Sequence, residues 1–282
     1  MQVLVTGGRG LLGDAMRREF AAGHDVIAVD RTALDVTDAA AVEQVVSSAR
    51  PDVIVNCAAF NDVDGAEDAP ATALEVNAFA VLTLARAAVR AGATLVHFSS
   101  DFVFDGETDH PYVEEDRANP QGAYAASKLL GDWFALESPR AYVLRVESLF
   151  GPPVESGSRR GSLGMIVDRV RAGEEVPVFV DRTVSPGHTP DIARATRALV
   201  ERGAPAGLYH CVNTGHATWA AIAAYIAGQL GVPLRTRPLT LESANLRARR
   251  PRYCALSNRK LAAAGIEMPS WQAALGEFLG HS

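Results

Sequence analysis

The segment QGAYAASKLLGDW, residues 121–133, places Tyr124 and Lys128 four positions apart. On a helix, side chains with this spacing lie on one face, one turn above each other. A tyrosine phenol has a pKa of about 10, and a nearby ammonium group lowers that value by favouring the ionised form. The pair therefore indicates a phenol tuned to donate a proton near neutral pH. Because helices without a catalytic role also contain this spacing, the rest of the chain has to supply the context.

A second chemical signal lies near the N-terminus, in VLVTGGRGLLG, residues 3–13. Gly7, Gly10 and Gly13 follow a short apolar run and precede an amphipathic stretch, which predicts a strand-to-helix turn. Glycines in such a turn let the backbone bend sharply and approach a pyrophosphate, which binds at the helix N-terminus. The alternative is a tight turn that binds no ligand. The turn predicts a dinucleotide cofactor in contact with Gly7, Arg9, Gly10, Leu11, Leu12 and Gly13.

The choice between the two nicotinamide cofactors depends on the end of the second apolar run. Asp30 ends this run, where a carboxylate bonds the adenosine ribose hydroxyls and repels a 2′-phosphate. Arg31 follows directly and Arg9 lies in the glycine turn, so either guanidinium could hold that phosphate. These residues do not choose between NADH and NADPH, and we expect both cofactors to be usable.

The elements that would position these residues alternate between strands and helices over residues 1–150. Apolar runs predict strands buried on both faces at residues 2–6, 25–30, 51–59, 94–100 and 141–146. Amphipathic stretches predict helices between them at residues 11–20, 39–49, 71–91 and 123–136. Strict alternation of this kind indicates an α/β fold with a Rossmann-like, doubly wound parallel sheet.

The pattern of elements changes after Gly151. A segment rich in glycine, serine and proline, residues 152–164, predicts a mobile loop. Shorter elements follow, with helices expected at residues 165–172, 191–201, 219–230 and 271–279. We expect a dinucleotide-binding domain of residues 1–150 plus about 181–214. A smaller, discontinuous C-terminal lobe, of about 151–180 and 215–282, would bind the substrate.

Composition argues against several classes of protein. The net charge of −6 does not suggest a nucleic-acid partner, since such domains usually carry a basic face. Cys57, Cys211 and Cys254 are far apart, which fits reduced thiols and offers no metal-ligand spacing. The first apolar run is too short for a signal peptide, and the longest apolar stretch, residues 71–89, is interrupted by charged residues. We expect a cytoplasmic protein without a membrane span or a structural metal.

Taken together, the glycine turn and the Tyr-x-x-x-Lys pair resemble the extended short-chain dehydrogenase/reductases. Further stretches resemble the dTDP-4-dehydrorhamnose reductases within that superfamily: LDVTD (34–38), DVIVNCAAFNDVDGAE (52–67), EVNAFAVLTLARAA (75–88), HFSSDFVFDG (97–106), RRPRYCALSNRKLAAAGI (249–266) and PSWQAALGEFL (269–279). The resemblance covers nearly the whole chain. It implies an enzyme that uses NADPH or NADH to reduce the 4-keto group of a dTDP-4-dehydro-6-deoxysugar, most simply dTDP-4-dehydro-L-rhamnose to dTDP-L-rhamnose.

The resemblance also implies which residues act. Ser100 matches the family's catalytic Ser or Thr, and with Tyr124 and Lys128 it completes the family's catalytic set. Ser100 would polarise the ketone, Tyr124 would donate the proton, and Lys128 would also bond the nicotinamide ribose. A strand-end cap is the alternative role for Ser100, and packing is the alternative for the alanines in the next set. The implied contacts to adenine and to the rest of the cofactor are Asp35, Val36, Ala58 and Ala59.

The sequence departs from the family where the sugar would bind. Phe102 stands for a tyrosine, Ser148 for a tryptophan and Arg182 for a glutamine. Because a site built for one hydroxyl pattern discriminates against another, these changes could alter which sugar is accepted. The expected substrate contacts are Ser100, Asp101, Phe102, Ser148, Arg182 and Arg250.

Arg250 is among these contacts because a guanidinium fork matches the oxygens of a nucleotide diphosphate. For any one arginine, the alternative is a solvated basic surface. The other candidates for this role are Arg159, Arg160, Arg247, Arg249 and Arg252.

Two rival functions remain open at this stage. One is reduction of a different nucleotide-diphosphate sugar, which the departures favour. The other is a non-catalytic, NADP-binding regulatory subunit, which the intact Ser100, Tyr124 and Lys128 argue against. Related enzymes often form homodimers, sometimes with magnesium at the interface, so a homodimer is possible here, but the sequence places no magnesium ligands.

Overall fold

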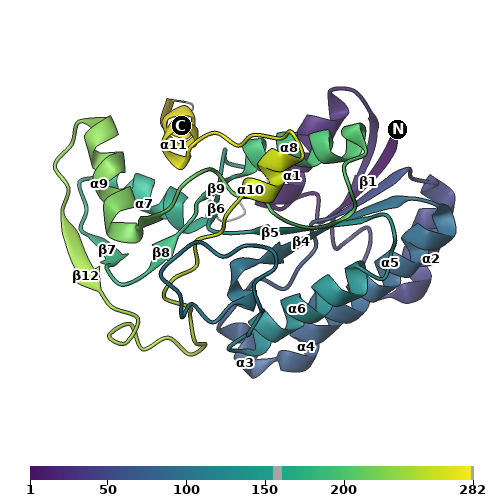
Figure 1. The fold of residues 1–282 in the computed structure, drawn as a ribbon, viewed down its shortest axis with the longest axis horizontal. Helices are drawn as coiled ribbons and strands as arrows, with labels where there is room; N and C mark the ends of the chain where they lie inside the picture. The colour runs from purple at the N-terminus through teal and green to yellow at the C-terminus, as the bar shows by residue number, and fades with distance from the viewer. Residues whose placement is uncertain (155–160, 281–282) are drawn as a thin grey trace.

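The computed structural model describes residues 1–154 and 161–280, and its centre is a parallel sheet of six strands (Figure 1). The strand order is β10-β5-β4-β3-β1-β2. Strands whose sequences are mostly apolar, such as β3 and β5, are buried along their whole length, as a sheet covered on both faces requires. The strands are β1 (Gln2–Thr6), β2 (Asp25–Val29), β3 (Val53–Asn56), β4 (Thr94–Ser100), β5 (Ala141–Val146) and β10 (Gly207–His210).

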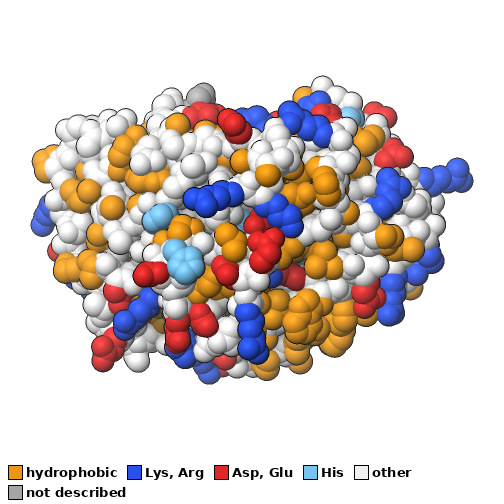
Figure 2. Space-filling model, in the orientation of Figure 1, with side chains coloured by type: hydrophobic (Ala, Val, Ile, Leu, Met, Phe, Trp, Pro, Cys, Tyr) orange, Lys and Arg blue, Asp and Glu red, His pale blue; other side chains and the backbone are white. Residues whose placement is uncertain are grey.

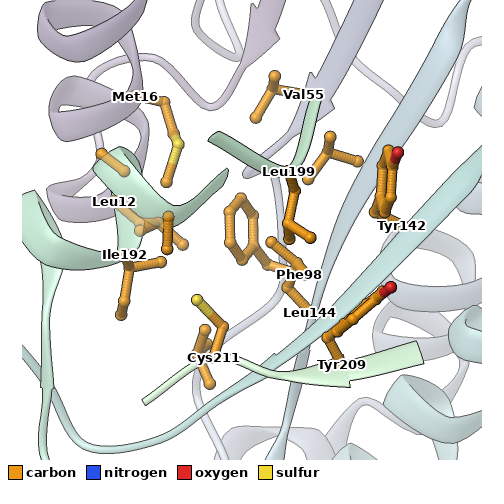
Figure 3. Packing of buried hydrophobic residues seen from close by; sticks show 14 of the residues in the cluster. Leu12, Met16, Val55, Phe98, Tyr142, Leu144, Ile192, Leu199, Tyr209 and Cys211 are labelled. Atoms are coloured by element: carbon orange, nitrogen blue, oxygen red, sulfur yellow. The ribbon is translucent and has the colours of Figure 1, made fainter. Parts of the chain in front are cut away.

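Helices cover both faces of this sheet, which confirms the predicted Rossmann-like arrangement (Figure 1). On one face, α1 (Leu11–Ala21) and α8 (Thr189–Arg202) pack on the sheet, where Met16, Ile192 and Leu199 surround Phe98 and Leu144 (Figure 3). The other face packs on α2 (Ala39–Ala49), α5 (Ala80–Ala91) and α6 (Ala123–Ala135). Successive residues of each strand point to opposite faces, so one strand supplies both cores.

The helix predicted over residues 71–91 contains an irregular turn. It consists of α4 (Pro70–Leu74), a π-helical turn, η1 (Glu75–Phe79), and α5, and is preceded by the short helix α3 (Gly65–Asp68). Such π turns occur mostly as single turns inside α-helices, frequently at functional sites. Among the described residues, only the segment Pro70–Ala91 is long and apolar enough to cross a membrane, and half of its most apolar window is buried inside the fold.

A smaller group of elements has its own apolar cluster, at the left of Figure 1. Here β7 (Val176–Phe179) pairs with β12 (Thr236–Leu239) under α7 (Gly161–Arg171) and α9 (Trp219–Leu230), beside α11 (Trp271–Gly280). Because α7 begins at Gly161, the loop predicted through Gly164 ends earlier than expected. The short elements are η2 (Asp101–Val103), β6 (Leu149–Phe150), β8 (Thr183–Val184), β9 (Gly187–His188), β11 (Ala217–Thr218) and α10 (Arg259–Ala263).

Candidate active site

A cavity of about 280 Å³ opens at the carboxyl ends of the central strands, where ligands bind in open α/β sheets. Its lining brings together twelve residues predicted from the sequence: Gly10, Leu11, Leu12, Gly13, Ala58, Ala59, Ser100, Asp101, Phe102, Tyr124, Lys128 and Ser148. The other predicted residues lie outside this lining: Gly7, Arg9, Asp30, Arg31, Asp35, Val36, Arg182 and Arg250.

The glycine turn leaves no room for side chains at two of its positions. Gly7 has φ +65°, and a Cβ on it would lie 2.8 Å from Ala58 N. A Cβ on Gly13 would lie 2.1 Å from Gly7 O, so the close contact between α1 and the turn requires glycine. Gly10 N donates to Gly7 O at 2.9 Å, and no side chain caps the N-terminus of α1. The free N–H groups of that helix start suit a pyrophosphate.

The end of β2 lies beside this turn, because Gly8 N donates to Val29 O at 2.9 Å. Asp30 follows and accepts hydrogen bonds from Thr32 and from Arg9, and these bonds lower the pKa of its carboxyl to about 2. It therefore stays ionised and able to accept from ribose hydroxyls. Arg31 is highly exposed, 3.8 Å from Asp35.

Asp35 and Val36, the expected adenine contacts, continue from this corner. The Asp35 carboxylate accepts from the hydroxyl and the N–H of Thr37 at 2.7 and 3.0 Å. The Val36 side chain is buried in the core shared with α2, so only its backbone and edge are available to a ligand.

Tyr124, Lys128 and Ser100 meet in the cavity from two neighbouring elements. Tyr124 and Lys128 lie one turn apart on α6, and their residues are only 9% and 2% exposed. Ser100 ends β4; its hydroxyl donates to Asp101 Oδ1 at 2.9 Å and accepts from Phe102 N at 3.2 Å. Ser100 therefore caps the η2 turn, as its alternative role predicted, while also lining the pocket.

Burial has the largest effect on the pKa values of Tyr124 and Lys128. Lys128 Nζ donates to Phe98 O at 2.6 Å, and burial lowers the pKa of its ammonium group to about 8, against the opposing effect of Asp132. Burial raises the pKa of the Tyr124 phenol, and the Ser100 hydroxyl offsets this only in part. The phenol pKa is therefore raised where a lowered value was expected from the sequence, because desolvation dominates and the carboxylates of Asp101 and Asp132 add to the increase.

The π turn connects the cofactor side of the pocket to α6. Asn77 Oδ1 accepts from Phe60 N at 2.8 Å, and its Nδ2 donates to Phe60 O and Ser127 Oγ. The Ser127 hydroxyl in turn donates to Tyr124 O at 2.7 Å. A Cβ on Gly131 would lie 2.2 Å from Asn77 O, so α6 approaches the π turn very closely. Asn77 therefore has a structural role, because it joins the backbone at Phe60, just after Ala58 and Ala59, to α6.

Two buried supports of the pocket were missed by sequence reasoning. Asp132 continues the Tyr124–Lys128 spacing by one more turn and pairs with Arg145 on β5 at 3.1 Å, with both side chains buried. Asn56, the polar end of β3, accepts from Thr6 Oγ1 at 2.7 Å and from Ala58 N at 3.2 Å. Two signals in the sequence could have indicated these supports. Asn56 is a polar residue at the end of an apolar strand, and Asp132 is a carboxylate one further turn along the helix that carries Tyr124 and Lys128.

Beyond Ser100, the pocket wall continues into a cluster of buried charges. Asp101 and Glu147 line the pocket and are 3% and 2% exposed. Arg182 Nη2 lies 3.8 Å from Asp101 Oδ2 and donates to Cys254 Sγ at 3.4 Å. The Arg182 guanidinium also lies 5.3 Å from the centre of the Phe102 ring. Ser148, at φ +43°, follows Glu147 in a backbone conformation uncommon for serine.

The tail arginines are engaged by carboxylates. Arg250 makes two bonds, of 2.7 and 2.8 Å, to Asp64, next to the pocket residue Val63. Arg247 pairs with Asp68. Arg250 therefore lies near the pocket mouth with its fork already occupied, while the candidates Arg159 and Arg160 lie outside the described residues.

A parallel six-stranded sheet, with a glycine turn after its first strand and Ser, Tyr and Lys at its carboxyl edge, defines a Rossmann-type protein of the short-chain dehydrogenase/reductase class. The chain belongs to the RmlD substrate binding domain family, whose model matches residues 1–282. The family resemblance predicted from the sequence is thereby confirmed.

Individual relatives span nearly the whole chain. It is 38% identical to a dTDP-4-dehydrorhamnose reductase of Streptomyces griseus, over 97% of this chain and 91% of that protein. A "probable dTDP-4,6-dihydroxy-2-methyloxan-3-one 4-ketoreductase" of Streptomyces antibioticus is 34% identical, over 98% of this chain and 94% of that protein. The solved dTDP-4-dehydrorhamnose reductase of Bacillus anthracis in complex with NADP superposes with a TM-score of 0.93, at 30% identity over 99% of each chain.

Proposed function

We propose that this chain is an NAD(P)H-dependent oxidoreductase that reduces the 4-keto group of a dTDP-4-dehydro-6-deoxysugar, with dTDP-4-dehydro-L-rhamnose giving dTDP-L-rhamnose. The observation that carries the proposal is the convergence of Ser100, Tyr124 and Lys128 in one pocket beside the glycine turn. The relatives named above support the substrate class.

The residues present fit a nicotinamide dinucleotide. Gly7 and Gly13 make a turn that no larger residue could form, and the start of α1 is left without a side-chain cap. Asp30 supports binding of the adenosine ribose, and Arg9 and Arg31 support tolerance of a 2′-phosphate. When bound, the cofactor supplies the hydride that adds to the ketone carbon.

The chain's own groups would handle the charge and the proton. As the carbonyl oxygen gains negative charge, the Ser100 hydroxyl turns from Asp101 Oδ1, to which it donates in this structure, and donates to that oxygen instead. Tyr124 then transfers its phenolic proton to that oxygen, so the C=O group becomes CH–OH: the C–O single bond stays, the hydride forms the new C–H bond and the proton forms the O–H bond. The raised pKa of the buried phenol keeps it protonated across the neutral range. Lys128 stabilises the resulting phenolate.

The remaining expectations concern the localisation, the partners and the domains of the protein. We propose a cytoplasmic protein whose partner is the nucleotide sugar and not nucleic acid or a membrane, with residues 1–150 and about 181–214 as the cofactor domain.

Phe79 and Trp133 are 51% and 60% exposed, and hydrophobic side chains gather on the face that carries α6 (Figure 2). This face supports a homodimer.

Magnesium is not assigned to a site. The described residues hold two groups of three possible ligands, Asp101–Glu147–Cys254 and His188–Asp191–Glu277. In each group an arginine, Arg182 or Arg194, already pairs with an aspartate, so the chemistry of these clusters favours an internal ion pair over a bound cation.

The test is oxidation of NADPH and NADH, followed by absorbance, with enzymatically prepared dTDP-4-dehydro-L-rhamnose. We expect rapid turnover, and a loss of about 10²–10⁴-fold in kcat in Tyr124→Phe with cofactor binding unchanged, because only the proton donor is removed. Near-normal turnover in that variant would exclude Tyr124 as the donor. A wild-type protein that binds cofactor but leaves it unoxidised would contradict the proposed substrate.

A second candidate is reduction of a different dTDP-keto-sugar. It is favoured by Glu147 and Arg182, two ionisable groups with little solvent exposure at and behind the pocket wall, and by the Streptomyces antibioticus relative. Higher kcat/KM with another dTDP-4-keto-sugar than with dTDP-4-dehydro-L-rhamnose would select it. A regulatory role without catalysis is disfavoured, because Ser100, Tyr124 and Lys128 lie together in the pocket.

A further inference from the structure

Arg182 stands apart from the other predicted substrate residues of the pocket. Its side chain is 12% exposed and lies outside the pocket lining, behind Asp101 and Phe102. On its other side it lines a separate cavity of about 360 Å³ beneath α7 and α9. This geometry therefore argues against direct contact between Arg182 and the sugar. The two contacts that Arg182 makes toward the pocket need another explanation.

The first contact leads to the serine. Arg182 Nη2 lies 3.8 Å from Asp101 Oδ2, and the other oxygen of that carboxylate accepts from the Ser100 hydroxyl at 2.9 Å. The guanidinium thus holds the carboxylate that fixes the position of Ser100 Oγ. Glu147, whose Oε2 accepts from Ser185 N at 2.6 Å, presents a second buried carboxyl to the same guanidinium.

The second contact leads to the tyrosine. The guanidinium lies 5.3 Å from the centre of the Phe102 ring, within the range of a cation–π interaction. The Phe102 ring meets the Tyr124 ring edge-to-face at 88°, with their centres 5.6 Å apart. This is a preferred aromatic geometry, so the position of one ring constrains the other.

We propose that Arg182 is a positioning residue that orients both groups expected to act on the carbonyl oxygen, Ser100 through Asp101 and Tyr124 through Phe102. The proposal rests on the proposed function, because both groups are assigned to that reaction. It also explains why a buried arginine is retained here at all. A guanidinium is always charged, and desolvating it is costly unless both its charge and its flat face find partners.

The test compares steady-state constants of Arg182→Ala with those of the wild type, using NADPH and dTDP-4-dehydro-L-rhamnose. Misplacement of reacting groups by about 1 Å can cost about 10²-fold in rate, so we expect kcat to fall by about 10- to 100-fold. The KM of the sugar and the dissociation constant of NADPH should change by less than about threefold, because Arg182 touches neither ligand.

Chemical rescue separates positioning from simple destabilisation. Because Arg182 lines the second cavity, truncation leaves a space that guanidinium chloride at millimolar concentration can enter. We expect added guanidinium to restore a large part of kcat without raising the melting temperature. The matched control is Arg169→Ala, since Arg169 lines the same cavity and is paired with Glu174 instead of the pocket residues. It should keep wild-type kcat and show no response to guanidinium.

A double-mutant cycle with Phe102→Leu tests the second contact. If the ring transmits the effect of Arg182, the two substitutions together should cost less in kcat than the product of their separate effects. If Arg182→Ala does not fold, Arg182→Lys provides the same test, since it keeps the charge but loses the planar stack, and its kcat should still fall.

The inference would be overturned by a kcat within twofold of the wild type in Arg182→Ala, or in Arg182→Lys if only that variant folds. A change confined to the KM of the sugar would also overturn it. So would effects of Arg182→Ala and Phe102→Leu on kcat that multiply exactly, together with no restoration of kcat by guanidinium. Failure of the wild type itself to oxidise NADPH with this sugar would instead contradict the proposed function.

Discussion

The glycine turn and the charge cluster beyond Ser100 belong to one pocket, yet they are made from different parts of the polypeptide. The cofactor side is main chain: Gly7 and Gly13 matter because a Cβ would collide with backbone atoms 2.8 and 2.1 Å away. The side expected to bind the sugar is made of side chains, with Asp101, Glu147 and Arg182 contributed by three separate segments. A short sequence motif can predict a site built from main chain. A site built from buried side chains depends on contacts between distant segments, which the spacing of residues in the sequence does not predict.

The largest expected effect concerns Lys128, a buried cation of the pocket. Burial lowers the pKa of its ammonium group from 10.5 to about 8, so below pH 8 the buried charge destabilises the fold by up to about 3 kcal/mol. Lys128→Met should therefore be more stable than the wild type at pH 7. The unfolded chain binds the extra proton between the two pKa values, so this advantage should disappear as pH rises from 8 to 10.5.

Urea denaturation of the cofactor-free protein at pH 7 and pH 10 measures this difference. The control is Lys260→Met, because Lys260 is exposed on α10. A Lys128→Met variant less stable than the wild type at pH 7 would mean that the bond from Nζ to Phe98 O outweighs desolvation.

The next effect tests whether the cofactor side depends on main chain alone. Gly13→Ala forces a Cβ to within 2.1 Å of Gly7 O, and overpacking of this kind costs about 1–3 kcal/mol. We expect the dissociation constant of NADPH, measured by fluorescence titration, to rise by about 10- to 100-fold. Gly228→Ala on α9 is the matched control, since nothing lies within 4 Å of its added Cβ. Unchanged affinity for NADPH in Gly13→Ala would show that cofactor binding does not depend on the close backbone contact in the glycine turn.

On the sugar side, Glu147→Gln probes the protonation of the buried carboxyl. Burial raises the pKa of Glu147 well above its ordinary value, so the folded protein holds a proton that the unfolded chain releases above pH 4.5. The wild type should therefore lose stability as pH rises above 4.5, while the variant, which has no titratable group at this position, should not show this loss and should gain in stability relative to the wild type. Glu137→Gln, at an exposed position, should follow the wild type in the same denaturation series. Parallel curves for Glu147→Gln and wild type would indicate an ionised Glu147.

The smallest effect concerns cofactor choice. The Arg31 side chain is 88% exposed, and exposed charges contribute about 0–1 kcal/mol. Arg31→Ala should therefore lower the ratio of kcat/KM for NADPH over NADH by only about threefold. Arg90→Ala, which removes an exposed arginine paired with Glu43, should leave the ratio unchanged. A change above tenfold would show that a side chain, and not main chain, controls this part of the site.

The difference between main-chain and side-chain sites also separates the features that could be predicted from the sequence from those that could not. The α/β sheet, the glycine turn and the helix carrying Tyr124 and Lys128 are local patterns, and the structure has all of them. The π turn was not predicted, because it depends on Asn77 bonding Phe60 and Ser127 from other segments. The burial of Arg182 was not predicted either, since its partners lie about 70 to 80 residues away in the chain. The site roles themselves remain predictions until the variants are measured.

The position of β10 in the sheet has a consequence for synthesis of the chain. Strand β10 pairs along Tyr142–Arg145 of β5, so the edge of β5 stays open until residue 210 has left the ribosome. At about 5–20 residues per second, the 60 residues after position 150 take about 3–12 s to make. During that time an apolar strand exposes unpaired N–H and C=O groups, which are a template for aggregation. Fragments that end near residue 150 are thus expected to precipitate, although they contain the whole glycine turn and all of Ser100, Tyr124 and Lys128.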